Sequence, residues 1–185
     1  RERYAPQNAL LGIAGDVRAQ ELIPQLEKWF AGWQRHDVER TRPANPVAAT
    51  SRKVYLVHRP NSVQTTVALG NIAIERRSPD YIPMVVMNHI LGGGVSGRLF
   101  LNLREEKGYT YGVYSDFSAR RYPGPWRAGG SMPTEVTAGV LVEFFKEINH
   151  IRDQTVPPTE LEDSKRAIAA RFALSLAQPP AILRV

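Results

Sequence analysis

A glycine-rich corner inside residues 91–115 is the feature of this sequence that most limits its possible folds. The segment reads LGGGVSGRLFLNLREEKGYTYGVYS and contains three consecutive glycines, Gly92–Gly94. Apolar residues at helical spacing precede these glycines, and a second helical pattern begins near Ser96 and ends at Gly108. Because glycine ends helices readily and tolerates sharp changes of chain direction, the segment predicts two helices joined by a flexible corner.

The patterns on either side of this corner mix strands and helices. Short apolar or β-rich runs predict strands at 9–16, 53–59, 63–74, 110–118 and 125–131. Apolar residues at helical spacing predict further helices around 22–33, 136–151 and 161–176. Consecutive strands are close in sequence, so we expect an α+β two-layer sandwich, with helices packed on one face of a mixed, largely antiparallel sheet.

Residues 1–185 are expected to form a single α+β domain, which is an ordinary size for one domain. The sequence lacks an initiator Met and ends without a terminal signature, so we expect it to be a fragment of a longer chain. No apolar run approaches the roughly 18 residues that a membrane span needs, which predicts no membrane-spanning segment.

The charge is positive but dispersed. Twenty-four basic and 18 acidic residues give a net charge of +6, and several arginines stand in pairs, such as Arg76-Arg77 and Arg120-Arg121. An anionic partner is one interpretation of these pairs. A solvated basic surface is favoured, because no run of five or six like charges occurs. No signature of a nucleic-acid-binding module is present either, so we expect no nucleic-acid partner.

Local metal and nucleophile motifs are missing. The chain has no cysteine, and its four histidines, His36, His58, His89 and His150, form neither a His-x-x-Glu-His nor a Glu-x-x-His motif. A Gly-x-Ser-x-Gly elbow is also absent. We therefore expect no metal ligands and no cofactor-binding residues in this chain.

The glycines do not form a phosphate-binding loop. Gly92 and Gly97 have the spacing of a G-x-x-x-x-G-K-[ST] motif, but Arg98 and Leu99 replace the Lys and the Ser or Thr. The preceding segment is also predicted to be a helix, where the motif requires a strand. The neighbouring carboxylates Glu105 and Glu106 point about 100° apart on a helix, so they cannot share a proton as a catalytic pair does.

The corner and its surroundings resemble the insulinase/pitrilysin family of zinc metallopeptidases. The resemblance rests on YAPQNALLGIAGDV near the start, on VQTTVALG, and above all on ILGGGVSGRLFLNLREEKGYTYGVYS. In that family, two half-enzymes of α+β domains close around an unfolded peptide, and one domain holds zinc with a His-x-x-Glu-His motif. The resemblance implies that this chain is a second, zinc-free domain of metallohydrolase-like fold.

The resemblance also implies two catalytic residues. The family's zinc-free half contributes an Arg and a Tyr seven positions apart, and Arg104 and Tyr111 stand at that spacing. Arg104 is expected near the end of a helix and Tyr111 at the start of the strand beyond Gly108, so that both face one cavity. Tyr109 shares the strand parity of Tyr111 but occupies a position that is usually apolar in the family, so we expect it to pack in the interior.

The missing zinc motif implies a partner. We expect zinc to be held by a His-x-x-Glu-His domain, either elsewhere on the same polypeptide or on a separate subunit, with a dimer as one possible arrangement. In this interpretation the chain binds peptide substrate, is inactive by itself, and completes a metalloendopeptidase that cleaves unfolded peptides. The alternative is a non-catalytic structural or peptide-binding assembly subunit of the same family. Such a subunit would resemble the core proteins of respiratory complexes.

Overall fold

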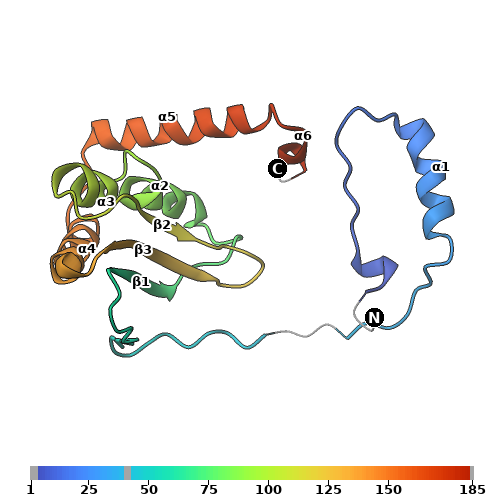
Figure 1. The fold of residues 1–185 in the computed structure, drawn as a ribbon. Coiled ribbons are helices and arrows are strands. Elements are labelled where there is room, and N and C mark those ends of the chain that lie inside the picture. Colours follow the sequence, from blue (N-terminus) through green and yellow to red (C-terminus); the bar gives the residue numbers. More distant parts are fainter. Residues whose placement is uncertain (1–3, 40–42, 184–185) are drawn as a thin grey trace. The chain divides into compact units, whose positions relative to one another are not determined.

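The computed structural model describes residues 4–39 and 43–183, and the chain forms two compact units. One comprises Arg1–Ala44 with Ala169–Val185, and the other comprises Asn45–Ile168. The first unit contains the short helix η1 (Pro6–Asn8), helix α1 (Ala19–Phe30) and helix α6 (Pro179–Ile182) (Figure 1).

The first unit differs from the sequence prediction in one element. Helix α1 confirms the predicted helix, but the described residues of this unit include no strand, so the strand predicted at 9–16 is wrong. Leu10 in that segment is 99% exposed and Trp29 on α1 is 67% exposed. A short apolar run becomes a strand only where a neighbouring strand shares its backbone hydrogen bonds, and the described residues provide no such neighbour for it.

The second unit is built on a three-stranded antiparallel sheet. Its strands are β1 (Gln64–Ile72), β2 (Val113–Phe117) and β3 (Pro125–Pro133), in the order β1-β3-β2. Side chains alternate across each strand, and Val67, Val113, Ala128 and Met132 all face the buried side of the sheet. This pattern confirms three of the predicted strands.

The strand predicted at 53–59 is wrong. Val54, Tyr55, Leu56 and Val57 are between 84% and 91% exposed, and the sheet pairs this segment with no strand. Its β-branched and aromatic residues favour extended backbone, but β propensity reflects packing against neighbours and does not by itself create a strand.

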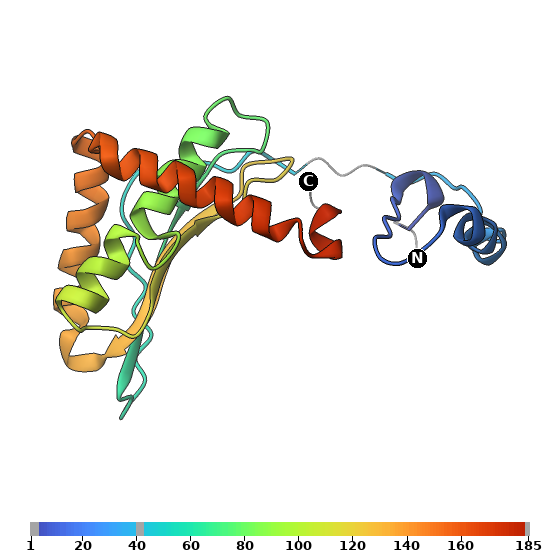
Figure 2. The ribbon, with the colours of Figure 1, turned by 90° about the horizontal axis from the view of Figure 1, so that it is seen from above.

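Helices cover the buried face of the sheet, as Figure 2 shows from above. They are α2 (Tyr81–Gly92), α3 (Arg98–Phe100), the π-helix η2 (Leu101–Glu106), η3 (Thr134–Val136), α4 (Thr137–Asp153) and α5 (Pro158–Ser175), whose first part belongs to this unit. The predicted α+β class, with helices on one face of an antiparallel sheet, is confirmed. No helix in the described part of the chain has the length and apolar character to cross a bilayer.

The hydrophobic core lies between the sheet and these helices. Its fully buried members come from α2, α3, η2, β3 and α4, and they are Leu91, Leu99, Leu103, Met132, Val140 and Phe144. Leu99 and Leu103 stand four residues apart on the continuous helix formed by α3 and η2, so one face of that helix is held in the core. The core therefore fixes this helix, and Arg104 extends from it one turn beyond Phe100, at the edge of the buried face.

Candidate functional site

The glycine corner brings the end of α2 against the backbone of β2. A Cβ atom at Gly92 would lie 2.7 Å from the Ser115 nitrogen, so only glycine permits this approach. The Nδ2 of Asn88 also donates a hydrogen bond of 2.9 Å to the Ser115 carbonyl. The predicted helix–corner–helix arrangement is thus present, and its glycines allow close backbone packing.

An open hollow of about 380 Å³ lies beside this corner. Two segments and one aromatic side chain line it: the glycine corner with Val95 (92–95), the strand residues 113–116, and Phe100. Glycines on one side and a strand on the other leave room for an extended segment.

Arg104 lies on η2, where the helix is wider than an α-helix. The Lys107 nitrogen donates to the Asn102 carbonyl at 2.9 Å, five residues back, as a π-helix requires. The Arg104 guanidinium lies 4.7 Å from the centroid of the Phe100 ring, and its Nε is 3.7 Å from a Glu105 carboxylate oxygen. The Arg104 side chain remains 43% exposed, so its donors are accessible. Phe100 lines the hollow, but neither Arg104 nor Tyr111 is among its lining residues.

Tyr111 lies in the loop between η2 and β2. It was expected at the start of the strand, but β2 begins two residues later, at Val113. Gly108 has a φ of 65°, a left-handed conformation that suits glycine, and it turns the chain between Arg104 and Tyr111. Tyr111 is 91% exposed, so its hydroxyl is accessible.

Tyr109 has a different environment, because it packs against the hydrophobic core. A Cβ atom added to Gly139 on α4 would lie 3.3 Å from the Tyr109 ring. Tyr109 is half-buried and packs against the core, as predicted, and Tyr111 is the exposed one of these two tyrosines.

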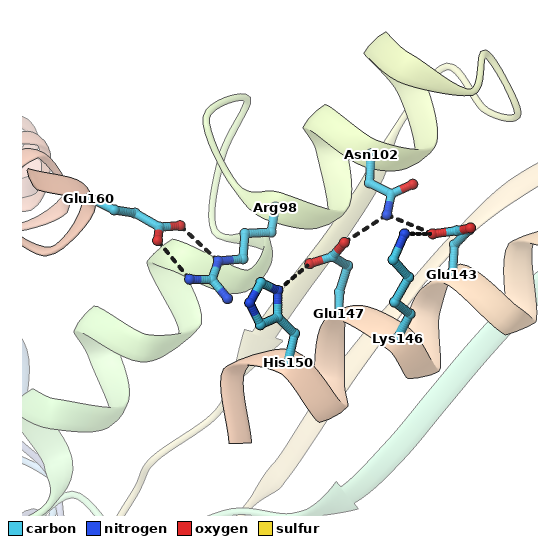
Figure 3. A network of polar contacts seen from close by, with 7 residues as sticks. All are labelled: Arg98, Asn102, Glu143, Lys146, Glu147, His150 and Glu160. Carbon is cyan, nitrogen blue, oxygen red and sulfur yellow. Dashed lines mark hydrogen bonds and ion pairs between the residues drawn. The ribbon is translucent and has the colours of Figure 1, made fainter. Parts of the chain in front are cut away.

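A polar network holds the helix that carries Arg104 (Figure 3). Arg98, at the start of α3, donates from Nε and Nη2 to the two carboxylate oxygens of Glu160 on α5, at 2.8 and 2.6 Å. The Arg98 side chain is only 11% exposed. A two-pronged guanidinium–carboxylate pair of this kind fixes orientation as well as distance.

The same network ties η2 to α4. Asn102 is buried, and its Nδ2 donates to Glu143 at 2.8 Å and to Glu147 at 2.7 Å. His150 Nδ1 lies 4.0 Å from the second carboxylate oxygen of Glu147, Oε2. Figure 3 shows this contact beside the Asn102 bonds. The sequence does not predict these pairs, because the partners are 41 to 62 residues apart and no local pattern signals the pairing.

The Arg98–Glu160 pair is expected to make stability depend on pH. The hydrogen bond from Arg98 lowers the pKa of Glu160 below 4.5, although partial burial opposes this shift. A carboxylate with a depressed pKa in the folded state stabilises above its unfolded-state pKa, and this contribution is lost as pH falls through the folded value. Wild type should therefore exceed Glu160→Gln in free energy of unfolding above about pH 5, and the difference should shrink towards about pH 3.

Urea denaturation of both proteins across this pH range measures the difference. Glu162→Gln is the matched control, because Glu162 pairs with Lys165 at a site that is about half exposed, where ion pairs contribute little. A difference between wild type and Glu160→Gln that stays constant with pH would show that the pair does not contribute through charge.

The described residues contain no group of three or more His, Cys, Asp or Glu side chains that could hold a metal ion. The side chains in this part of the chain therefore do not fit a zinc site. We expect the purified chain to retain no stoichiometric zinc after dialysis at neutral pH, and metal analysis measures this directly. One tightly bound zinc ion per chain would contradict the assignment to a zinc-free domain.

Comparison with known proteins places this combination of fold and zinc-free site in one class. Residues 1–168 match the family model of the peptidase M16 inactive domain. The chain belongs to this family, which confirms the family predicted from the glycine corner and its surroundings.

Relatives and solved structures agree with this membership. The Bacillus subtilis protein described as uncharacterized zinc protease YmxG is 26% identical over 173 residues, which are 94% of this chain but 41% of that protein. A peptidase M16 inactive domain structure from Pseudomonas fluorescens is 28% identical, with a TM-score of 0.73 over 84% of this chain and 37% of its own. A protease structure from Helicobacter pylori, 18% identical over 91% of this chain and 41% of its own, shares the fold with a TM-score of 0.78.

Proposed function

We propose that this chain is the zinc-free, substrate-binding part of a metalloendopeptidase that cleaves unfolded peptides. Membership of the inactive-domain family supports this role, as do relatives that are described as zinc proteases and are more than twice as long as the match. We expect zinc to be bound by a partner domain or subunit with a His-x-x-Glu-His motif. A dimer with such a subunit is one form that this pairing takes.

Arg104 and Tyr111 are proposed to act on the peptide at the bond that is cleaved. The guanidinium of Arg104 offers a planar fork of donors to a peptide carbonyl. The hydroxyl of Tyr111 can donate a hydrogen bond to the oxygen that becomes negative when the scissile carbonyl is attacked. Neither residue supplies the nucleophile, so the chain is expected to be inactive without its partner.

One observation carries this proposal. Arg104 and Tyr111 flank the turn at Gly108, both side chains are exposed, and Arg104 extends from a helix that is fixed in the core by Leu99, Phe100 and Leu103. A rigid element that presents exposed donors suits catalysis, which needs donors placed before the reaction begins.

Reconstitution tests the proposal. This chain, the zinc-bearing half and the mixture are each assayed with an internally quenched, unstructured peptide, with and without a metal chelator. We expect cleavage from the mixture, none from this chain by itself, and loss of activity with chelator. If the zinc-bearing half is equally active without this chain, the chain is a non-catalytic assembly subunit.

A further inference from the structure

Two arginine pairs that are distant in sequence meet at one end of the sheet. The Arg76 nitrogen donates to the Arg120 carbonyl at 2.8 Å, and the Ala73 nitrogen donates to the Gly124 carbonyl at 2.7 Å. These bonds tie the segment before α2 to the loop between β2 and β3. All four guanidinium-bearing side chains are exposed, and we call them the arginine cluster: Arg76, Arg77, Arg120 and Arg121.

Two guanidiniums of the arginine cluster lie beside aromatic rings, and none of the four has a neutralising partner among the described residues. The Arg76 guanidinium lies 3.8 Å from the centroid of the Tyr81 ring, and that of Arg121 lies 5.8 Å from the Tyr122 ring. No ion pair among the described residues joins any of the four to a carboxylate. The segment before α2 contains two acidic residues, Glu75 and Asp80, and the loop between β2 and β3 contains none. Four arginines therefore face two carboxylates in these segments, and the local charge is positive. Such a patch attracts an anionic group.

The cluster stands at the far end of β2 from the proposed catalytic residues. Tyr111 precedes β2, and the loop with Arg120 follows it. The hollow runs along β2 between the two ends, since Val113 to Asp116 line it. Phe100, which also lines it, lies 4.7 Å from the Arg104 guanidinium. A five-residue strand spans about 17 Å, so a peptide lying along β2 crosses this distance in about five residues.

We propose that the arginine cluster binds acidic side chains of the peptide substrate, about five residues from the bond that is cleaved. This inference rests on the proposed function, since it takes the peptide to pass Arg104 and Tyr111. The Asp116 carboxylate in the hollow repels acidic residues there, which favours acidic residues beyond the hollow and defines their register. An unfolded acidic peptide fits better than nucleic acid, because the rings of Tyr81 and Tyr122 beside the cluster already contact its arginines, and single-strand binding relies on rings that stack on bases.

Peptide binding to the purified chain tests this inference without catalysis. The probes are fluorescein-labelled, unstructured peptides of about 14 residues, with a block of about four Glu or four Gln at one end, long enough to span β2 and the cluster. Each peptide is made in two forms, with the block at the amino or at the carboxyl end. At about 50 mM salt, fluorescence anisotropy should show roughly tenfold tighter binding of the Glu peptide than of the Gln peptide for at least one of these two forms. This preference should largely vanish at about 300 mM salt.

A quadruple Arg→Gln variant of the cluster should bind the Glu and Gln peptides equally. The matched control is a second quadruple variant, in which four exposed basic residues outside the cluster are replaced by Gln: Lys28, Arg35, Lys53 and Arg59. It loses the same amount of positive charge as the cluster variant. Circular dichroism establishes that both variants fold. The inference is overturned if the control loses the preference as fully as the cluster variant, or if wild type shows no preference.

Two further measurements define the occupant and its path. A Glu peptide with a photo-crosslinking residue about five positions from its acidic block should label residues 92–95 or 113–116, and labelling confined to other segments would overturn the proposed path. A single-stranded oligonucleotide of the same charge should bind more weakly than the Glu peptide, and tighter binding would overturn the choice of peptide. None of these binding measurements uses peptide cleavage. A negative result in them would therefore overturn this inference without bearing on the reconstitution, which tests the proposed function.

Discussion

Replacing Tyr111 with Phe is expected to lower kcat about 10²- to 10³-fold in the reconstituted enzyme. The substitution removes one exposed hydroxyl and no buried contact, so the fold should be unchanged. A hydrogen bond made only in the transition state affects kcat and kcat/KM alike, so KM should change little. Steady-state cleavage of an unstructured peptide measures both constants.

Arg104 is expected to act on peptide binding as well. Arg104→Ala should lower kcat/KM more than Tyr111→Phe does, because both the grip on the peptide and a positive charge are lost. Arg104→Lys should fail to restore activity, since an ammonium lacks the planar fork of donors.

The controls for these variants are surface residues outside the proposed path of the peptide. Tyr55→Phe removes another exposed tyrosine hydroxyl and Arg166→Ala another exposed guanidinium, and both should retain wild-type kinetics. If Arg104→Ala and Tyr111→Phe also retain wild-type kcat/KM, the catalytic role is wrong and the chain is a structural subunit.

Replacing Phe144 with Ala is expected to lower the free energy of unfolding by about 3–5 kcal/mol. Phe144 on α4 is fully buried in the cluster that joins the sheet to α3 and η2. The truncated side chain leaves a cavity that the surrounding core cannot fill, because protein interiors are close-packed. Urea denaturation followed by circular dichroism measures the change.

Phe172→Ala on α5 is the matched control for this loss. Phe172 is 52% exposed, so its truncation should cost about 1 kcal/mol or less. Equal destabilisation by the two substitutions would contradict the placement of the core between the sheet and α4. A smaller loss at Phe144, comparable to that of a surface residue, would do the same.

Local sequence determined the elements that depend on neighbouring residues. The glycine corner, the helices on either side of it and the hairpin of β2 and β3 follow from periodicity and from glycine's freedom, and the structure confirms them. The absence of a zinc motif is likewise a property of local spacing. Arg104 and Tyr111 were found from their spacing within a long family pattern, and their roles remain predictions.

Tertiary structure decided every feature that depends on distant residues. Equally apolar segments became the strand β1 at one place and exposed coil at 53–59 at another, because a strand needs a partner that composition does not specify. Packing also distinguished the half-buried Tyr109 from the exposed Tyr111, although both stand beside the same turn. Likewise, Arg98 pairs with Glu160, which is 62 residues away in the sequence. A backbone hydrogen bond between two loops also brings the two arginine pairs together in one cluster. Local patterns cannot encode such long-range contacts, because these contacts form only when hydrophobic burial brings separate elements together.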